Sequence, residues 1–101
     1  MISVCCVMPV WKFGLQVKTA IESIQKNENS VTFIIIDNGA DPDVKDVIYD
    51  VKDAVVIKND NNRLVNHAWN QGLQTAVDLK FNLVLLSNSD IILHDNLDIV
   101  K

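Results

Sequence analysis

Glycine, proline and cysteine are scarce in this chain, and each scarcity excludes a class of protein. The 101 residues include three glycines, two prolines and two cysteines. Dinucleotide-binding folds and P-loops need a glycine-rich turn after the first strand, whereas the turn here holds only Gly14. Cys5 and Cys6 are adjacent, and neighbouring side chains on a strand point to opposite faces, so they cannot easily form a disulfide. The sequence therefore predicts two buried free thiols in a reducing compartment, which we expect to be the cytoplasm.

Positive charge and long apolar runs are also lacking. The formal net charge is −4. A protein that holds nucleic acid through its phosphates needs a basic face, so we expect no nucleic-acid partner. No apolar run approaches the ~20 residues that cross a bilayer, so we expect no membrane span. The apolar residues 1–10 lack a basic leader and a small-residue cleavage site, and we do not expect a signal peptide there.

Hydrophobic residues, in contrast, are plentiful. They make up 49% of the chain, enough to build the core of one domain over residues 1–101. Four short apolar runs are typical of strands buried on both faces, and they cover residues 2–8, 31–36, 54–57 and 81–86. Between these runs, apolar residues recur at helical spacing, from Leu15 to about Asn27, from Pro42 to Val51 and from Val65 to Val77.

The order of these elements predicts the fold class. Alternating strands and amphipathic helices indicate an α/β domain with a mainly parallel sheet covered by helices on its faces. Trp69 lies on the apolar stripe of the third helix and is expected in the core. A further helix is expected to begin near Asp95.

Polar residues follow three of the predicted strands at their carboxyl ends. Pro9-Val10-Trp11 follows the first strand, Asp37-Asn38-Gly39 the second and Asn88-Ser89-Asp90 the fourth. Ligands of open parallel sheets bind beyond the carboxyl ends of the strands. The sequence therefore predicts a candidate site where these three loops meet.

Each of these clusters also has a purely structural interpretation. The Asn38-Gly39 pair tolerates positive φ and can form a simple turn. Asn88-Ser89-Asp90 can end a strand as a cap or an Asx turn. Arg63, before the third helix, can be a solvated surface residue, and Trp11 can be a core residue.

Four segments together resemble the family-2 glycosyltransferases. "VCCVMPVW" is similar to their opening strand, and "IIIDNGA" to the end of their second strand, Val-Val-Asp-Asp-Gly-Ser. "NRLVNHAWNQGLQTA" resembles the helix entry that carries their Asn-x-Gly pairs. "VLLSNSDIIL" resembles the strand with their Asp-x-Asp motif, in the Asn-x-Asp form of the rhamnosyltransferase-like branch. The order and spacing of the four segments carry the resemblance, which covers nearly all of the chain.

The resemblance implies a truncated GT-A fold, a three-layer α/β/α arrangement that binds a nucleoside-diphosphate sugar. The complete enzyme would transfer the sugar to an acceptor hydroxyl on a saccharide, a lipid-linked saccharide or a protein, as in polysaccharide biosynthesis. A divalent cation, Mn²⁺ or Mg²⁺, would bridge carboxylate and phosphate oxygens and stabilise the departing nucleoside diphosphate. Asp90 stands where the family has its metal-binding aspartate.

The resemblance also implies a set of substrate-binding residues, namely Pro9, Val10, Trp11, Asp37, Asn38, Arg63, Asn70 and Asn88. The first three match the loop that packs against the nucleobase, and the next two match the pair bordering its pocket. Arg63 would reach a phosphate, since guanidinium groups and helix N-termini both favour anions. Asn88 would donate hydrogen bonds to the ribose or the sugar, and Asn70 matches a family asparagine to which we assign no role.

The chain departs from the family pattern in several places. Lys12 replaces the usual asparagine, Leu64 the first glycine of the helix entry and Asn66 a small residue. Only 11 residues follow Asp90, whereas the family's acceptor-binding half and general base lie beyond that point. We therefore expect the acceptor-binding half to be absent and assign no catalytic residue.

Two alternatives to a glycosyltransferase remain open. The chain can be a nucleotide-binding module without catalysis, or a degenerate scaffold domain that has lost the ligand. The absent half also predicts an exposed apolar edge or face of the sheet and a tendency to self-associate.

Overall fold

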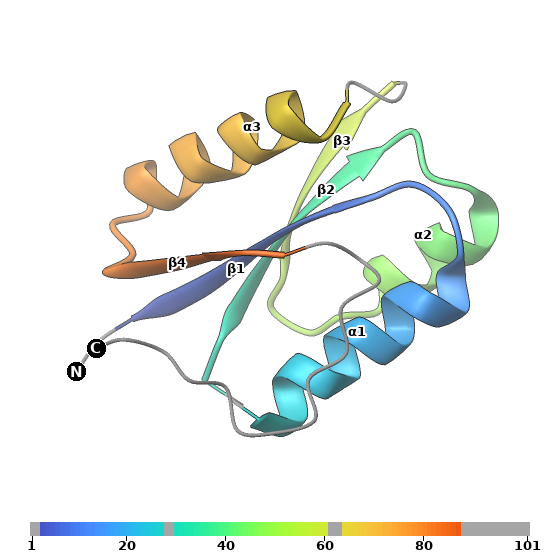
Figure 1. Cartoon of the computed structure of the whole chain (residues 1–101), viewed down its shortest axis with the longest axis horizontal. Coiled ribbons are helices and arrows are strands. Elements are labelled where there is room, and N and C mark those ends of the chain that lie inside the picture. Colours follow the sequence, from blue (N-terminus) through green and yellow to red (C-terminus); the bar gives the residue numbers. More distant parts are fainter. Residues whose placement is uncertain (1–2, 28–29, 61–63, 88–101) are drawn as a thin grey trace.

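The computed structural model describes residues 3–27, 30–60 and 64–87, and within these ranges strands and helices alternate (Figure 1). The elements are β1 (Val4–Val10), α1 (Gly14–Asn27), β2 (Thr32–Asn38), α2 (Pro42–Ile48), β3 (Val55–Asn59), α3 (Leu64–Asp78) and β4 (Leu83–Leu86). The predicted α/β class is confirmed. Within the described ranges, no helix has the length and apolar character needed to cross a membrane.

The strands form one parallel sheet in the order β3-β2-β1-β4. β1, in which every residue but Pro9 is buried, occupies an inner position, as its almost uninterrupted apolar sequence predicts. The register places Val10 of β1 beside Asp37 of β2, and Asn38 of β2 beside Asn59 of β3. The carboxyl ends of all the strands therefore meet at one edge of the sheet.

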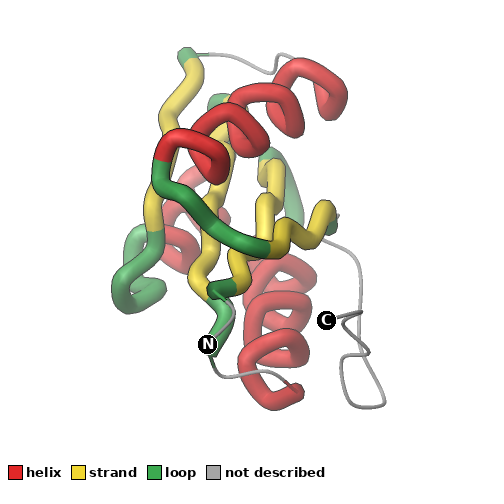
Figure 2. Tube along the Cα trace, turned by 90° about the vertical axis from the view of Figure 1, so that its left-hand side faces the viewer, coloured by secondary structure: helices red, strands yellow, loops and turns green. Residues whose placement is uncertain are grey.

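The helices cover both faces of the sheet. Helices α1 and α2 lie on one face and α3 lies on the other (Figures 1 and 2). Crossover connections between parallel strands are right-handed. A connection that runs across the sheet in the opposite direction therefore places its helix on the opposite face. β2 and β3 are added on one side of β1 and β4 on the other, which accounts for the position of α3.

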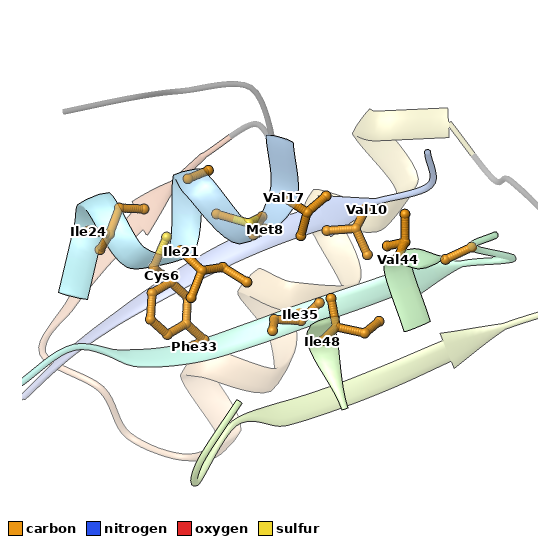
Figure 3. Close-up of a cluster of buried hydrophobic side chains, with 12 residues drawn as sticks. Cys6, Met8, Val10, Val17, Ile21, Ile24, Phe33, Ile35, Val44 and Ile48 are labelled. Carbon is orange, nitrogen blue, oxygen red and sulfur yellow. The ribbon is translucent and has the colours of Figure 1, made fainter. Parts of the chain in front are cut away.

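Two apolar clusters fill the space between the sheet and its helices. The cluster under α1 and α2 is the larger, and Figure 3 shows its main members, which include Met8, Val17, Phe33, Ile35 and Ile48. The cluster under α3 contains Cys5, Val7, Ile34, Ile36, Ala68 and Ala76. Residues of one strand alternate between the two clusters, as the two-residue period of a strand requires.

The two cysteines follow this alternation and confirm the prediction of buried free thiols. Cys5 faces the α3 cluster, and Cys6 faces the cluster under α1 and α2. Burial raises the pKa of Cys5 to about 11. Burial, with a smaller contribution from Cys5, raises the pKa of Cys6 to about 12 against the opposing effect of a hydrogen bond to Ser87. Both thiols are therefore protonated and unreactive at neutral pH.

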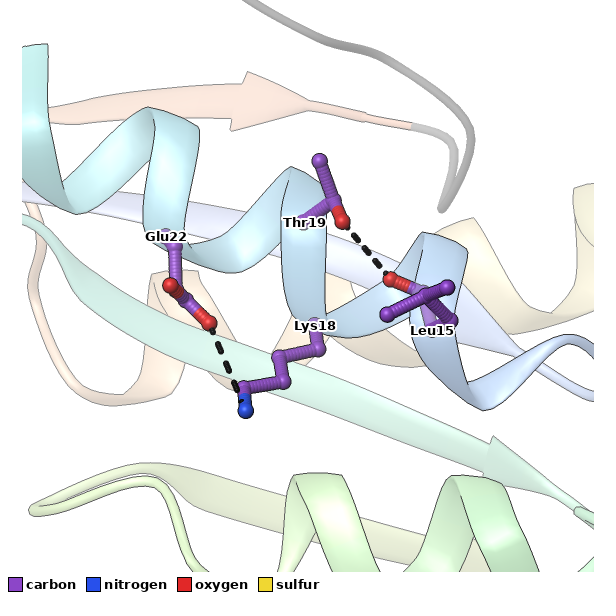
Figure 4. Close-up of polar contacts among 4 residues, drawn as sticks. All are labelled: Leu15, Lys18, Thr19 and Glu22. Atoms are coloured by element: carbon purple, nitrogen blue, oxygen red, sulfur yellow. Dashed lines mark hydrogen bonds and ion pairs between the residues drawn. The ribbon is translucent and has the colours of Figure 1, made fainter.

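The outer face of α1 carries local polar contacts (Figure 4). Lys18 Nζ lies 3.9 Å from Glu22 Oε1 one turn later, and Thr19 Oγ1 donates to the Leu15 carbonyl oxygen at 2.8 Å. Exposed ion pairs between residues four apart on a helix contribute only about 0.3–0.5 kcal/mol to the free energy of unfolding. The helix is therefore held mainly by its buried face.

Several element boundaries differ from the sequence-based expectation. β3 continues two residues beyond its expected end, to Asn59, and β4 begins at Leu83, two residues after its expected start. β1 continues through Pro9 to Val10, and β2 continues through Asp37 to Asn38. The Ser87 amide donates to the Val7 carbonyl, so the odd-numbered residues of β1 direct their backbone groups toward β4. The missing N–H of proline therefore ends the pairing with β4 and leaves the pairing with β2 intact.

Helix α2 ends at Ile48, three residues before the predicted end at Val51. The Tyr49 amide still donates to the Lys45 carbonyl, but the next two amides bond only three residues back. The last predicted turn is therefore a tightened, turn-like continuation in which Val51 still packs against the core.

Helix α3 approaches β1 closely at Gly72. A Cβ atom at this position would lie 2.1 Å from Cγ1 of Val7, far inside van der Waals contact. Only glycine lets the helix lie this close to the central strand.

We therefore predict that Gly72→Ala lowers the free energy of unfolding by about 1–3 kcal/mol, the usual cost of overpacking. Urea denaturation of the wild type, Gly72→Ala, Val7→Ala and the double variant measures this. Because Val7→Ala removes the methyl groups that clash, the double variant should lose less stability than the sum of the single losses. Strictly additive losses would contradict the close approach.

Candidate functional site

The loop after β1 is tied to the start of α2 at the carboxyl edge of the sheet. The Asp41 amide donates to the Trp11 carbonyl at 3.0 Å, and the Gly14 amide donates to Oδ2 of Asp43 at 3.0 Å. A Cβ on Gly14 would lie 2.8 Å from the Asp43 carbonyl oxygen, so only glycine fits. The carboxylate of Asp43 thus lies at the N-termini of both α1 and α2, where its negative charge interacts favourably with both helix dipoles.

Large apolar side chains are exposed in this loop and in the first turn of α1. Trp11, Phe13 and Leu15 are 44%, 66% and 79% exposed. Lys12 Nζ lies 4.5 Å from the centre of the Trp11 ring, and Phe13 has a φ of 66°, which is unusual for a bulky residue. The Trp11 side chain is therefore partly exposed with Lys12 over its ring, whereas its predicted companion Val10 is buried.

Asp37 is fully buried, and both of its carboxylate oxygens accept hydrogen bonds. Oδ1 accepts from the Ala40 amide at 2.8 Å, and Oδ2 accepts from the Tyr49 hydroxyl at 2.9 Å. Gly39, with φ of 70°, allows the chain to turn back toward this carboxylate. Asp37 thereby links the end of β2 to the end of α2.

Asn38 belongs to a cluster of three side-chain amides on the α3 face. Its Oδ1 accepts from Nδ2 of Asn59 at 2.8 Å. Asn59 and Gln71 donate to each other, at 2.8 Å from Nδ2 of Asn59 and 2.9 Å from Nε2 of Gln71. This amide cluster (Asn38, Asn59 and Gln71) joins the ends of β2 and β3 to α3.

Asp37 and Asn38 therefore point to opposite faces of the sheet, although the sequence suggests a single pocket-bordering pair. Asp37 accepts from Tyr49, the C-cap residue of α2, whereas Asn38 accepts from Asn59 at the end of β3, which is in turn bonded to Gln71 of α3. A ligand that contacts both must lie beyond the ends of the strands and share these oxygens with the protein.

The other predicted residues lie in different surroundings. Pro9 is half-buried in β1, and Asn70 is exposed on α3. Arg63, Asn88 and Asp90 lie outside the described residues. Ser87, the residue before Asn88, is buried, and its amide extends the pairing of β4 with β1.

Within the ranges that the structure describes, no group of three His, Cys, Asp or Glu side chains is arranged to hold a metal ion. Asp37, the carboxylate at the end of β2, already accepts two hydrogen bonds.

Two hollows on the described surface lie away from this edge. One lies between α1 and the end of α2 and is lined by residues that include Lys18, Glu22 and Lys52. The other lies near the start of β2 and includes Thr32 and Asp53. Neither includes a residue of the predicted site.

Local sequence patterns do not reveal the residues that hold the predicted ones in place. Tyr49 is the single tyrosine of the chain and sits at the end of a helical stripe, a weak signal in itself. Asn59 ends an apolar run, and Gln71 directly precedes Gly72. Their pairing depends on the sheet order, which local patterns do not reveal.

No model of a known protein family matches this chain, and no curated protein matches it as a relative. The assignment of a function therefore depends on the residues and the fold.

We predict that Gln71→Ala lowers the free energy of unfolding by about 1–3 kcal/mol, because it leaves the amide of the buried Asn59 without two of its partners. Urea denaturation measures the loss. Gln74→Ala, an exposed change one turn away on the same helix, is the matched control and should stay within about 0.5 kcal/mol of the wild type. Equal effects of the two changes would contradict a structural role for the amide cluster.

A second prediction concerns Tyr49. Desolvation raises the pKa of its phenol above the usual value, and the hydrogen bond to Asp37 and the negative charge of Asp37 raise it further. A pKa that is raised in the folded state means that the protonated phenol stabilises the fold. This stabilisation is fully present at pH values below the ordinary tyrosine pKa and is lost as the pH rises through the raised pKa.

Because Tyr49 is the single tyrosine, the ultraviolet absorbance of tyrosinate reports its ionisation alone. The titration midpoint should lie at lower pH in Asp37→Asn than in the wild type, since the substitution removes the negative charge. Asp78→Asn, at the far end of α3, should leave the midpoint unchanged. Circular dichroism at each pH confirms that the proteins are folded, and an unshifted midpoint in folded Asp37→Asn would contradict the contact.

Proposed function

We propose that this chain binds a nucleoside-diphosphate sugar together with a divalent cation, as the donor-binding part of a GT-A glycosyltransferase related to the rhamnosyltransferase-like branch. The observation that supports this best is the strand order β3-β2-β1-β4. The order reverses between β1 and β4, and ligands of open α/β sheets bind at the carboxyl ends of the strands beside such a reversal. The three motif-bearing loops follow β1, β2 and β4 at that edge.

The arrangement of side chains suits a nucleotide. The exposed indole of Trp11 can stack on a nucleobase, and Asp37 and Asn38 present oxygen atoms at the neighbouring strand end. The hydrogen bonds from Ala40, Tyr49 and Asn59 hold these oxygens in place before a ligand arrives. Pre-ordering of this kind reduces the entropy lost on binding.

The phosphates would lie between α3 and the segment after β4. Helix α3 begins at Leu64, so Arg63 stands directly before its N-terminus, where backbone amides and a guanidinium group together favour anions. A bound Mg²⁺ or Mn²⁺ would supply Lewis-acid stabilisation of the nucleoside diphosphate as it leaves the sugar. Asp90 would hold that ion. The positive charge of the ion would offset the negative charge of the diphosphate, which otherwise repels a chain with a net charge of −4.

A degenerate scaffold is the second candidate, and one observation favours it. Both polar side chains at the end of β2 are buried, and both accept hydrogen bonds from protein groups. Such groups can be retained for stability alone, since a buried polar group costs free energy unless it is hydrogen-bonded. Ligand binding distinguishes the two candidates.

Calorimetric titration with UDP, dTDP and GDP, each with and without Mn²⁺, tests the proposal. We expect one nucleotide to bind only with the metal and Asp90→Ala to weaken it at least about tenfold, or by ~1.4 kcal/mol. Asp78→Ala, which removes a carboxylate at the opposite end of α3, is the matched control and should bind as the wild type does. A folded wild type that binds none of the three would refute the proposal and favour the scaffold.

If a nucleotide binds equally well with and without Mn²⁺, and equally well to the wild type and to Asp90→Ala, the proposed nucleotide site stands and the proposed cation site is refuted. Transfer or hydrolysis of the matching nucleotide sugar then separates an enzyme from a binding module. The rhamnosyltransferase-like resemblance makes dTDP the first nucleotide to try.

A further inference from the structure

Asn38 is followed by Gly39, and this is the single Asn-Gly pair in the chain. An asparagine side chain can react with the backbone of the residue after it. The backbone nitrogen attacks Cγ of the asparagine, ammonia leaves, and a five-membered succinimide ring closes. Because glycine has no Cβ to hinder this attack, an Asn-Gly pair reacts more readily than other asparagine pairs. Asn38 is therefore the position at which the sequence favours deamidation most.

Water then opens the succinimide ring. Its addition at one carbonyl gives aspartate, and its addition at the other gives isoaspartate, in which the backbone runs through the side-chain carbon. The net reaction consumes water, releases ammonia and needs no oxidant or reductant. Either product carries a negative charge that asparagine lacks.

The backbone around Asn38 opposes closure of this ring. Asn38 is the last residue of β2, and it pairs in register with Asn59 of β3. Residues of a parallel strand have ψ of about +115°. Ring closure instead needs a negative ψ, which brings Cβ and the next backbone nitrogen to the same side of the Cα–C bond. The paired strand therefore holds the nitrogen of Gly39 away from Cγ of Asn38.

The amide cluster holds the side chain of Asn38 as well. Oδ1 of Asn38 accepts from Nδ2 of Asn59 at 2.8 Å, and Gln71 in turn bonds Asn59 through both of its amide atoms. Asn38 is 3% exposed. A turn of its side chain toward Gly39 would break a hydrogen bond between buried groups, which costs free energy. Burial also separates the reacting atoms from the water and base that the reaction uses.

We propose that Asn38 is a latent deamidation site that the amide cluster keeps closed. The reaction then proceeds from a locally open state, in which the end of β2 has separated from β3 and the side chain has turned toward Gly39. Its rate is the rate in the unfolded chain multiplied by the population of the open state. The reaction involves no ligand, so the inference is independent of the proposed nucleotide binding.

Deamidation would also disrupt the turn after β2. Isoaspartate at position 38 adds a carbon atom to the backbone between Asp37 and Ala40, whose amide donates to Oδ1 of Asp37 at 2.8 Å. The added atom would move that amide relative to the carboxylate. The reaction therefore converts a transient opening of this edge into a permanent change.

Incubation at mildly alkaline pH, in native buffer and in guanidinium chloride, locates the site. Peptide mass spectrometry follows deamidation at each asparagine. In guanidinium chloride Asn38 should react fastest, and Gly39→Ala should lose most of this reaction because its Cβ hinders the attack. In native buffer Asn38 should react at least about a hundredfold more slowly than in the denaturant. A faster site elsewhere in the unfolded chain, or equal rates in the two solutions, would refute the proposal.

Substitutions in the amide cluster test the gate. Asn59→Ala removes the donor to Asn38 and should raise the native rate at least about tenfold. Gln71→Ala keeps that donor but removes its support, so it should raise the rate by a smaller factor. Gln74→Ala, an exposed change on the same helix, is the matched control and should react as the wild type does. Circular dichroism confirms folding, and Gln71→Ala decides the outcome if Asn59→Ala does not fold.

A loss of global stability is separated from a local opening by Ile24→Val. Ile24 is buried on the other face of the sheet, in the cluster under α1 and α2. Ile24→Val should therefore lower the free energy of unfolding and leave the deamidation rate unchanged. Denaturation of each variant measures its stability. If the rates of all the variants follow global stability alone, or if the cluster variants react as the wild type does, the amide cluster is not the gate and the proposal fails.

Discussion

The close contact of Gly72 with Val7 determines where α3 lies, and much of the structure depends on that position. With α3 seated against β1, Gln71 reaches the end of β3 and completes the amide cluster. The same helix carries the chain across the α3 face to β4 on the far side of β1. A side chain at position 72 would press on the side chain of Val7 and displace the helix from the sheet, which would loosen both connections.

The polar residues at the carboxyl edge have a structural role whatever ligand they bind. Asp37 is buried and holds Ala40 and Tyr49, so it closes the turn after β2 and anchors α2. Asn38 and Asn59 join neighbouring strands to α3. Buried polar groups of this kind are stable only when they are hydrogen-bonded, so the same bonds that hold the fold also fix the oxygens that a ligand would meet.

The sequence predicted the strands and helices well where apolar residues recur with a clear period, as in α3. It misplaced the ends of β1 and β2, because Pro9, Asp37 and Asn38 usually mark turns. Proline is accommodated in β1 because its nitrogen faces the side on which pairing with β4 ends. Asp37 and Asn38 are accommodated in β2 because Tyr49 and Asn59 satisfy them, and these partners come from other elements.

The sequence by itself determined the α/β class, the buried thiols and the placing of the polar loops at the carboxyl ends of the strands. These features follow from the local periods of strands and helices, which any window of the chain contains. Only the tertiary structure decided that β4 lies beside β1 and which groups share the hydrogen bonds of Asp37 and Asn38. Those features depend on contacts between distant residues, such as Gly72 with Val7, which local patterns do not encode.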